Sequence, residues 1–187
     1  MGKHEVARHA VFLDRDGVIN RVVVRNGIPY PPCHAEEFEI YEDVPDGCAR
    51  LKAANFLLVV ITNQPDVGRG IQTREAVEAM NVKMQLALPS LDRIEVCYHG
   101  GERYGQSCDC RKPRSGLILR AAAELKIDPK RSYVIGDRWR DVDCARGAGC
   151  RAVFIQRGYK EMLREAPDFT VVNFNEAVSA VLGDAGV

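Results

Sequence analysis

The chain has 187 residues, 46% of them hydrophobic, which is the usual size of one domain built around one hydrophobic core. Its 26 basic and 26 acidic residues cancel, so the sequence offers no broad basic surface for a nucleic-acid backbone or an anionic membrane. The longest uninterrupted apolar run, 56–61, is far shorter than the ~20 residues of a membrane-spanning helix. We therefore expect a single soluble domain over residues 1–187, with no nucleic-acid or membrane partner.

The N-terminus and the cysteines indicate the compartment. Residues 1–14 contain no apolar segment of the kind that a secretory signal requires. Seven cysteines are too few for a disulfide scaffold of this length, and their odd number favours reduced thiols. We expect a cytoplasmic protein.

Short β-branched runs alternate with helical segments along the chain. Strands are expected at 10–13, 56–62, 93–98, 132–137, 151–155 and 169–172. Helices are expected at 46–54, 73–88, 115–126, 141–148 and 175–182, with Thr73 and Ser115 as N-caps. This alternation predicts an α/β fold with a doubly wound parallel sheet, whose ligand site lies outside the carboxyl ends of the strands.

Two carboxylates follow the first expected strand. Asp14 and Asp16 are separated by one residue, so in extended chain they point the same way, and Gly17 allows the chain to turn. Asp137 follows another strand and can supply a third oxygen. A single aspartate at a strand end is most often a turn or cap residue. The set together predicts a site for a hard divalent cation such as Mg²⁺.

Anion-binding groups follow two further segments. Thr62 ends a strand, and its hydroxyl together with the backbone amides of Asn63 and Gln64 could bind an anion. Lys112 precedes a helix expected to begin near Ser115, which places a cation beside an amide-rich helix N-terminus suited to phosphate. Taken alone, such residues are more often a polar turn and a surface lysine.

Four possible zinc ligands lie close together in the sequence, as C-x-H-x8-C-x-C: Cys97, His99, Cys108 and Cys110. Four such ligands complete a tetrahedral structural zinc site and leave no open position for catalysis. The alternative is a group of buried cysteines without metal. The sequence predicts a zinc ion that braces a loop.

The order FLDRDG, TNQ, RKP and GDRWRD resembles the four motifs of the haloacid dehalogenase superfamily of phosphotransferases, over about residues 10–148. The first motif is similar to that of its phosphatases. The Cys/His loop directly before RKP is similar to that of the zinc-containing branch, whose members act on heptose bisphosphate or histidinol phosphate.

The resemblance implies a role for each matching residue. Asp14 would be the nucleophile and Asp16 the general acid and base, while Thr62 and Lys112 would bind the phosphoryl oxygens. Arg111 would contribute to substrate recognition. The Mg²⁺ ligands would be Asp14, the backbone carbonyl of Asp16, and Asp137, and the carboxylate of Asp141 would support them. The Cys/His set would bind zinc.

The intervals between the motifs leave no room for a separate cap domain. The segment 21–44 and the Cys/His loop are therefore the material available to contact the far end of a substrate, through Arg21, Arg25 and Tyr30 and through Arg103 and Tyr104. The expected substrate-binding residues are Arg25, Asn63, Gln64, Arg111 and Arg138. Arginines there would suit a second phosphate, although solvated loop charges are an equal alternative.

We expect a monomeric, Mg²⁺-dependent phosphatase acting on a small phosphorylated sugar or polyol, first of all on the 7-phosphate of a heptose 1,7-bisphosphate. Histidinol phosphate is the nearest alternative substrate. A DNA 3′-phosphatase is disfavoured by the neutral charge, and a noncatalytic zinc-braced binding module by the presence of the full catalytic set. The sequence assigns no role to Cys33, His34, Cys48, Cys144 or Cys150.

Overall fold

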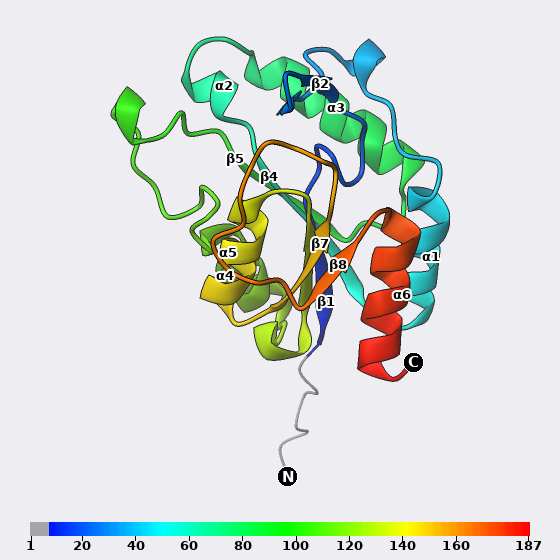
Figure 1. The fold of residues 1–187 in the computed structure, drawn as a ribbon. Helices are drawn as coiled ribbons and strands as arrows, with labels where there is room; N and C mark the ends of the chain where they lie inside the picture. The colour runs from blue at the N-terminus through cyan, green and yellow to red at the C-terminus, as the bar shows by residue number, and fades with distance from the viewer. Residues whose placement is uncertain (1–7) are drawn as a thin grey trace.

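The computed structural model describes residues 8–187, and its centre is a six-stranded parallel sheet (Figure 1). The strand order is β5-β4-β1-β6-β7-β8, where β1 is Ala10–Leu13, β4 Leu57–Asn63, β5 Arg93–Cys97, β6 Tyr133–Gly136, β7 Arg151–Ile155 and β8 Phe169–Val171. All five neighbouring pairs are parallel, which confirms the predicted sheet. The expected absence of a secretory signal rests largely on residues 1–7, which lie outside the described residues.

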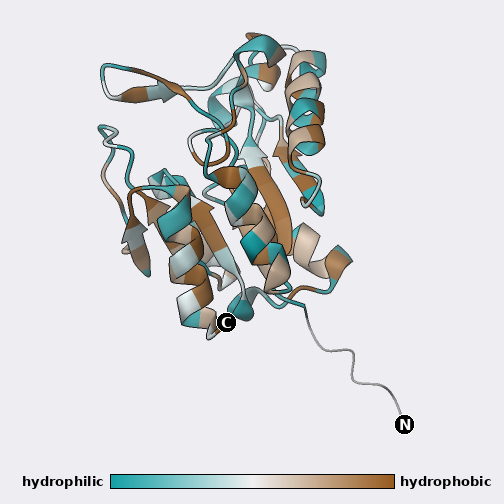
Figure 2. Ribbon diagram, turned by 90° about the vertical axis from the view of Figure 1, so that its right-hand side faces the viewer, coloured by the Kyte–Doolittle hydropathy of each residue, from teal (hydrophilic) through white to brown (hydrophobic). Residues whose placement is uncertain are grey.

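Helices cover both faces of the sheet (Figures 1 and 2). Helices α1 (Val44–Ala53), α3 (Arg74–Ala87) and α6 (Phe174–Ala185) pack on one face, against side chains such as Val11 and Leu13 of β1. Helices α4 (Gly116–Leu125) and α5 (Trp139–Ala148) pack on the other face, against Ala10 and Phe12. Successive residues of β1 thus enter opposite cores, as the two-residue period of a strand requires.

The chain reverses its direction of winding at β1. Strands β4 and β5 lie on one side of β1, and β6, β7 and β8 lie on the other. A crevice forms outside the carboxyl ends of the strands at such a switch point, because the two connections leave in opposite directions. Asp14 follows β1 and Asp137 follows β6, so the fold brings two of the expected metal ligands to this crevice.

A two-stranded hairpin lies within the segment 21–44, where no strand was expected. Strands β2 (Val23–Arg25) and β3 (Ile28–Tyr30) are antiparallel and are joined by Asn26 and Gly27. Both turn residues have positive φ angles, 55° and 79°, as the Asn-Gly turn of a tight hairpin requires. The backbone amide of Lys160 donates to the Gly27 carbonyl at 2.9 Å, so the hairpin tip contacts the loop after β7.

Short helices complete the described chain: α2 (Pro65–Gly68) and the 3₁₀ turns η1 (Ala35–Glu37), η2 (Glu102–Tyr104) and η3 (Pro129–Arg131). Between residues 8 and 187 no separate cap domain is inserted between the motifs, and no helix is long and apolar enough to cross a membrane. Three of the unassigned cysteines, Cys48, Cys144 and Cys150, are buried in the two cores, and Cys33 is exposed.

The two expected N-caps behave differently. The Thr73 hydroxyl accepts a hydrogen bond from the Ala76 amide at 3.1 Å, so this cap is confirmed. Ser115 occupies the N-cap position of α4, but its hydroxyl donates to the Cys144 carbonyl at 2.8 Å. The expected N-cap position of Ser115 is confirmed, but its side chain does not cap the helix, because a carbonyl of α5 accepts the hydrogen bond of its hydroxyl.

Candidate active site

Three carboxylates converge at the carboxyl ends of the central strands. Asp14, Asp137 and Asp141 are all buried, and one oxygen of each lies within 4.8 Å of the others. Gly17 makes this approach possible, because a Cβ atom at that position would lie 1.8 Å from Oδ2 of Asp137. Its φ of +91° is also readily accessible only to glycine.

Burial and mutual repulsion oppose the negative charges of this cluster. Burial, reinforced by the charge of Asp141, raises the pKa of Asp14 to about 6. Burial and the charges of Asp14 and Asp141 also raise the pKa of Asp137 well above its usual value. A bound cation would reverse both effects by compensating the charge.

The donor set fits Mg²⁺. Its atoms are carboxylate oxygens, the ligand type that this ion prefers. Both oxygens of Asp137 are buried, and neither has a hydrogen bond of good geometry with the described residues, although the Tyr159 hydroxyl lies close enough to lower the pKa of this carboxyl. A buried carboxylate without partners is costly unless it is held by a cation, so these oxygens are suited to metal ligation.

Lys112 is the positive charge within this cluster. Its Nζ lies 2.9 Å from Oδ1 of Asp14 and 2.6 Å from Oδ1 of Asp141, and it also donates to the Ile61 carbonyl at 2.9 Å. Its side chain is 1% exposed. Although burial opposes its charge, the two aspartates raise the pKa of Lys112, so the ammonium stays protonated.

The TNQ segment positions these groups. The side-chain amide of Asn63 forms a reciprocal pair with the backbone of Lys112, donating to its carbonyl and accepting from its amide, both at 3.0 Å. The Thr62 hydroxyl accepts from Nε2 of Gln64 at 2.9 Å, which leaves its own hydrogen available to donate. The backbone amide of Gln64 donates to the Cys97 carbonyl at 2.8 Å, so the expectation that it binds an anion is corrected.

Asp16 lies beside this cluster, and the group that holds it was not anticipated. Arg15 is fully buried and donates to both carboxylate oxygens of Asp16 at 3.0–3.2 Å. Asn20 donates to Oδ1 at 3.0 Å, and Gln64 donates to Oδ2 at 2.7 Å. The carboxylate of Asp16 is not a member of the three-carboxylate group, which is compatible with the expectation that only its backbone carbonyl would ligate a metal.

The expected zinc ligands lie together, with their ligand atoms within 4.8 Å of one another. The Sγ atom of Cys97 lies 3.8 Å from Sγ of Cys108. The Nδ1 atom of His99 lies 3.6 Å from Sγ of Cys97 and 3.3 Å from Sγ of Cys110. A tetrahedral site with Zn–S bonds of about 2.3 Å separates two sulfur atoms by about 3.8 Å. The distances and the thiolate and imidazole donors therefore fit zinc.

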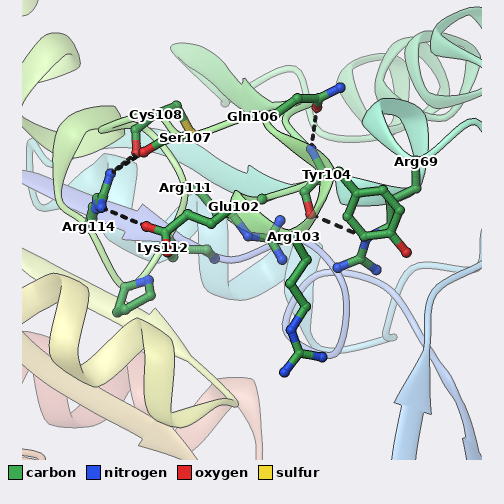
Figure 3. A pocket seen from close by; sticks show the side chains of 13 residues that line it. Arg69, Glu102, Arg103, Tyr104, Gln106, Ser107, Cys108, Arg111, Lys112 and Arg114 are labelled. Carbon is green, nitrogen blue, oxygen red and sulfur yellow. Dashed lines mark hydrogen bonds and ion pairs between the residues drawn. The ribbon is translucent and has the colours of Figure 1, made fainter.

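A cavity of about 480 Å³ lies along the Cys/His loop, and Lys112 is among the residues that line it (Figure 3). Arg114 and Arg69 lie at its two ends and Arg111 lies between them (Figure 3). Two of the arginines form ion pairs with carboxylates: Arg114 pairs with Glu102, and Arg69 pairs with Asp66. Within the described residues, the guanidinium groups of Arg103 and Arg111 have no carboxylate within 4.0 Å. Burial and the charges of Arg140 and Arg69 lower the pKa of Arg111, which indicates a site rich in positive charge.

Known proteins resemble this chain in sequence and architecture. A family model described as HAD-hydrolase-like matches residues 109–177. The D-glycero-beta-D-manno-heptose-1,7-bisphosphate 7-phosphatase of Haemophilus ducreyi is 32% identical over 184 residues, covering 94% of this chain and 98% of that protein. The protein of the same name from Escherichia coli K12 is 36% identical over 165 residues, covering 84% and 83%. The chain belongs to the HAD-like hydrolase family.

A solved structure extends the likeness of this HAD-like hydrolase to its fold. The crystal structure of D,D-heptose 1.7-bisphosphate phosphatase from B. bronchiseptica, complexed with magnesium and phosphate, superimposes with a TM-score of 0.79. The two proteins are 26% identical, and the match covers 95% of this chain and 99% of that one. The predicted superfamily and its class of reaction, phosphate-ester hydrolysis, are thereby confirmed.

Two expected substrate-binding arginines of the HAD-like chain lie outside the large cavity. The guanidinium of Arg138 pairs with the carboxylate of Glu161, and its backbone amide donates to Asp141 at 3.1 Å. Arg25 lies on the exposed hairpin, where its guanidinium is 5.5 Å from the centre of the Tyr30 ring. Neither contact directs these side chains to Lys112, so the structure lends their expected role no support.

The zinc site gives a direct prediction. We expect purified protein to contain about one zinc per chain, measured by elemental analysis, because the four donors match that ion. Cys108→Ser and Cys110→Ser should each lose the metal and lower the thermal midpoint. Cys33→Ser, at an exposed cysteine outside the cluster, is the matched control and should retain it. Protein prepared without chelator that contains no zinc would contradict the assignment.

Proposed function

We propose that this HAD-like hydrolase is a Mg²⁺-dependent phosphatase that removes the 7-phosphate of D-glycero-D-manno-heptose 1,7-bisphosphate. Its relatives carry the name of that activity. The observation that carries the substrate assignment is the arginine-lined cavity beside Lys112. One phosphate would lie at Asp14 and Lys112, and a second would meet Arg111 and Arg103, which have no acidic partner among residues 8–187.

The first half-reaction would use three of the described groups. A carboxylate oxygen of Asp14 attacks phosphorus, the bond to the sugar oxygen breaks, and Asp16 donates the proton that the leaving alkoxide takes up. Lys112 and the Thr62 hydroxyl bind the oxygens of the transferred phosphoryl group. Mg²⁺, when bound, supplies the positive charge that lets an anionic carboxylate approach an anionic phosphate.

The second half-reaction would restore the enzyme. Water attacks the phosphorus of the aspartyl phosphate, Asp16 accepts the water proton, and the bond from phosphorus to Asp14 breaks to release inorganic phosphate. Dividing the reaction in this way replaces one very slow displacement by two easier ones. The buried positions of Asp14 and Lys112 limit the competing access of bulk water.

Histidinol phosphate is the second candidate substrate, and it remains compatible with the same catalytic residues. It carries one phosphate and an amine, so the arginines of the cavity would meet no second anion. The charge of the cavity therefore favours the bisphosphate.

The seven cysteines, none of which forms a disulfide, support a reducing location such as the cytoplasm.

The test of this proposal is a comparison of kcat/KM for heptose 1,7-bisphosphate, heptose 7-phosphate and histidinol phosphate. We expect the bisphosphate to exceed the others by roughly tenfold to several hundredfold, since one or two charge-assisted contacts contribute ~1.5 to 3 kcal/mol each. Arg111→Ala should reduce that advantage mainly through KM, because a distant phosphate is bound similarly before and during the reaction.

Arg93→Ala is the matched control, because Arg93 pairs with Glu95 and Glu124 and does not line the cavity. We expect it to leave the substrate ranking unchanged. Histidinol phosphate as the best substrate of the three would replace the primary proposal by the second candidate, with the catalytic residues unchanged.

A further inference from the structure

Arg15 is a fully buried cation next to the expected nucleophile. Its side chain has 0% exposure, and its single ion pair within residues 8–187 is with Asp16, at 3.0 Å. The guanidinium carbon also lies 5.7 Å from the centre of the Phe38 ring. Burying a guanidinium is costly unless it is paired and hydrogen-bonded, and an apolar side chain could fill the same space at lower cost.

The guanidinium binds Asp16 in a fixed orientation. Nε and one terminal nitrogen approach Oδ1 at 3.2 Å, and the same terminal nitrogen approaches Oδ2 at 3.0 Å. The planar group therefore fixes the rotation of the carboxylate as well as its position. Asn20 and Gln64 add one donor to each oxygen, so both oxygens of Asp16 are held.

A second element anchors Arg15. Its other terminal nitrogen donates to Oδ1 of Asn81 at 3.1 Å, and Asn81 is a buried residue of α3, 66 positions later in the chain. The amide nitrogen of Asn81 lies 3.4 Å from Oε2 of Glu78, which assigns its oxygen to the Arg15 side. A polar residue on the buried face of α3 is thus explained by its contact with Arg15, since its buried neighbours Val77, Met80 and Met84 are apolar.

We propose that Arg15, anchored by Asn81, is a positioning residue that aligns Asp16 for proton transfer to the leaving group. The inference rests on the proposed phosphatase function, in which Asp16 is the general acid. An acid contributes to the rate only when it lies within hydrogen-bond reach of the leaving oxygen. The contact between Arg15 and Asn81 would reduce the rotational freedom of Asp16 and so favour that geometry.

The test compares two substrates that differ in their need for an acid. An alkyl phosphate has a strongly basic leaving oxygen, whereas 4-nitrophenyl phosphate has a leaving group that needs little protonation. We expect Asn81→Leu to lower kcat for the alkyl substrate about tenfold, which is part of the ~10²- to 10⁴-fold effect of a general acid. The kcat for 4-nitrophenyl phosphate should change less than twofold.

Two further variants separate positioning from packing. Asn81→Asp retains an oxygen acceptor for Arg15 but places a carboxylate beside Glu78, so it should keep the ratio of the two kcat values within about threefold of wild type even if its stability falls. Met84→Leu changes a buried apolar side chain of the same helix, which cannot hydrogen-bond to Arg15, so it reports on packing and should leave the ratio unchanged. Arg15→Lys keeps the charge but cannot bind both oxygens as a planar fork, and should lower the alkyl rate selectively.

Equal losses on both substrates in Asn81→Leu and Arg15→Lys, or no loss on either, would overturn the positioning role while leaving the phosphatase assignment intact. If Asn81→Leu does not fold, Arg15→Lys and Asn81→Asp decide the same question by the same ratio. Absence of any Mg²⁺-dependent hydrolysis by the wild-type protein would instead overturn the proposed function, and this inference with it.

Discussion

Asp14→Asn is expected to reduce turnover by at least ~10³-fold on every phosphate ester, because no neighbouring group can replace the attacking carboxylate. Lys112 and the Asp14 carboxylate are in contact at 2.9 Å, and the amide keeps the size of the side chain while removing its charge. Burial and Asp141 raise the pKa of Asp14 to about 6, so the native charge is already opposed by its surroundings. We therefore expect the thermal midpoint of the metal-free variant not to fall.

Asp46→Asn is the matched control for this change. It replaces an exposed carboxylate in the first turn of α1, outside the carboxylate cluster. We expect it to keep nearly wild-type turnover when initial rates are measured at saturating Mg²⁺. Hydrolysis by Asp14→Asn at a rate close to that of this control would rule out Asp14 as the nucleophile.

Lys112→Met should damage both stability and activity. Its ammonium compensates Asp14 and Asp141, so its removal leaves two buried carboxylates without a protein cation. Breaking a buried ion pair by removing one partner typically costs about 3–5 kcal/mol, and we expect a loss of this size in urea unfolding without Mg²⁺. Added Mg²⁺ should recover part of that stability, because it binds the folded carboxylate cluster.

The matched control for the stability effect is Lys52→Met. Lys52 pairs with Asp92 at 2.8 Å, but both side chains are about one-third exposed. Pairs of this kind contribute ~0–1 kcal/mol, so the control should lose at most that amount. Equal losses of unfolding free energy in the two variants would contradict the view that Lys112 compensates a buried cluster.

The sequence predicts the sheet and most of the site, because both depend on local patterns. Apolar runs of four to seven residues identify the strands, and parallel strands place Asp14, Thr62 and Asp137 at one edge. The candidate zinc ligands are recognised by residue type and proximity in the sequence. The hairpin at residues 23–30 was missed although its Asn26-Gly27 turn is a strong local signal.

Contacts between distant segments could not be predicted in this way. Arg15 follows a buried strand, yet its partner Asn81 lies on α3, and no local pattern relates the two residues. The ion pair between Arg138 and Glu161 likewise depends on how the loop after β7 returns to α5. Ser115 occupies a position typical of an N-cap, but the packing of α5 supplies a competing acceptor for its hydroxyl.

The most direct test of the proposed function is to follow heptose 1,7-bisphosphate by ³¹P NMR in the presence of Mg²⁺ and the wild-type protein. In the proposed orientation the 7-phosphate lies at Asp14 and Lys112, which are in contact, and the 1-phosphate lies among the arginines of the cavity. The proposed function predicts loss of the 7-phosphate signal, growth of inorganic phosphate and retention of the 1-phosphate. Release of the 1-phosphate, or an unchanged spectrum, would contradict it.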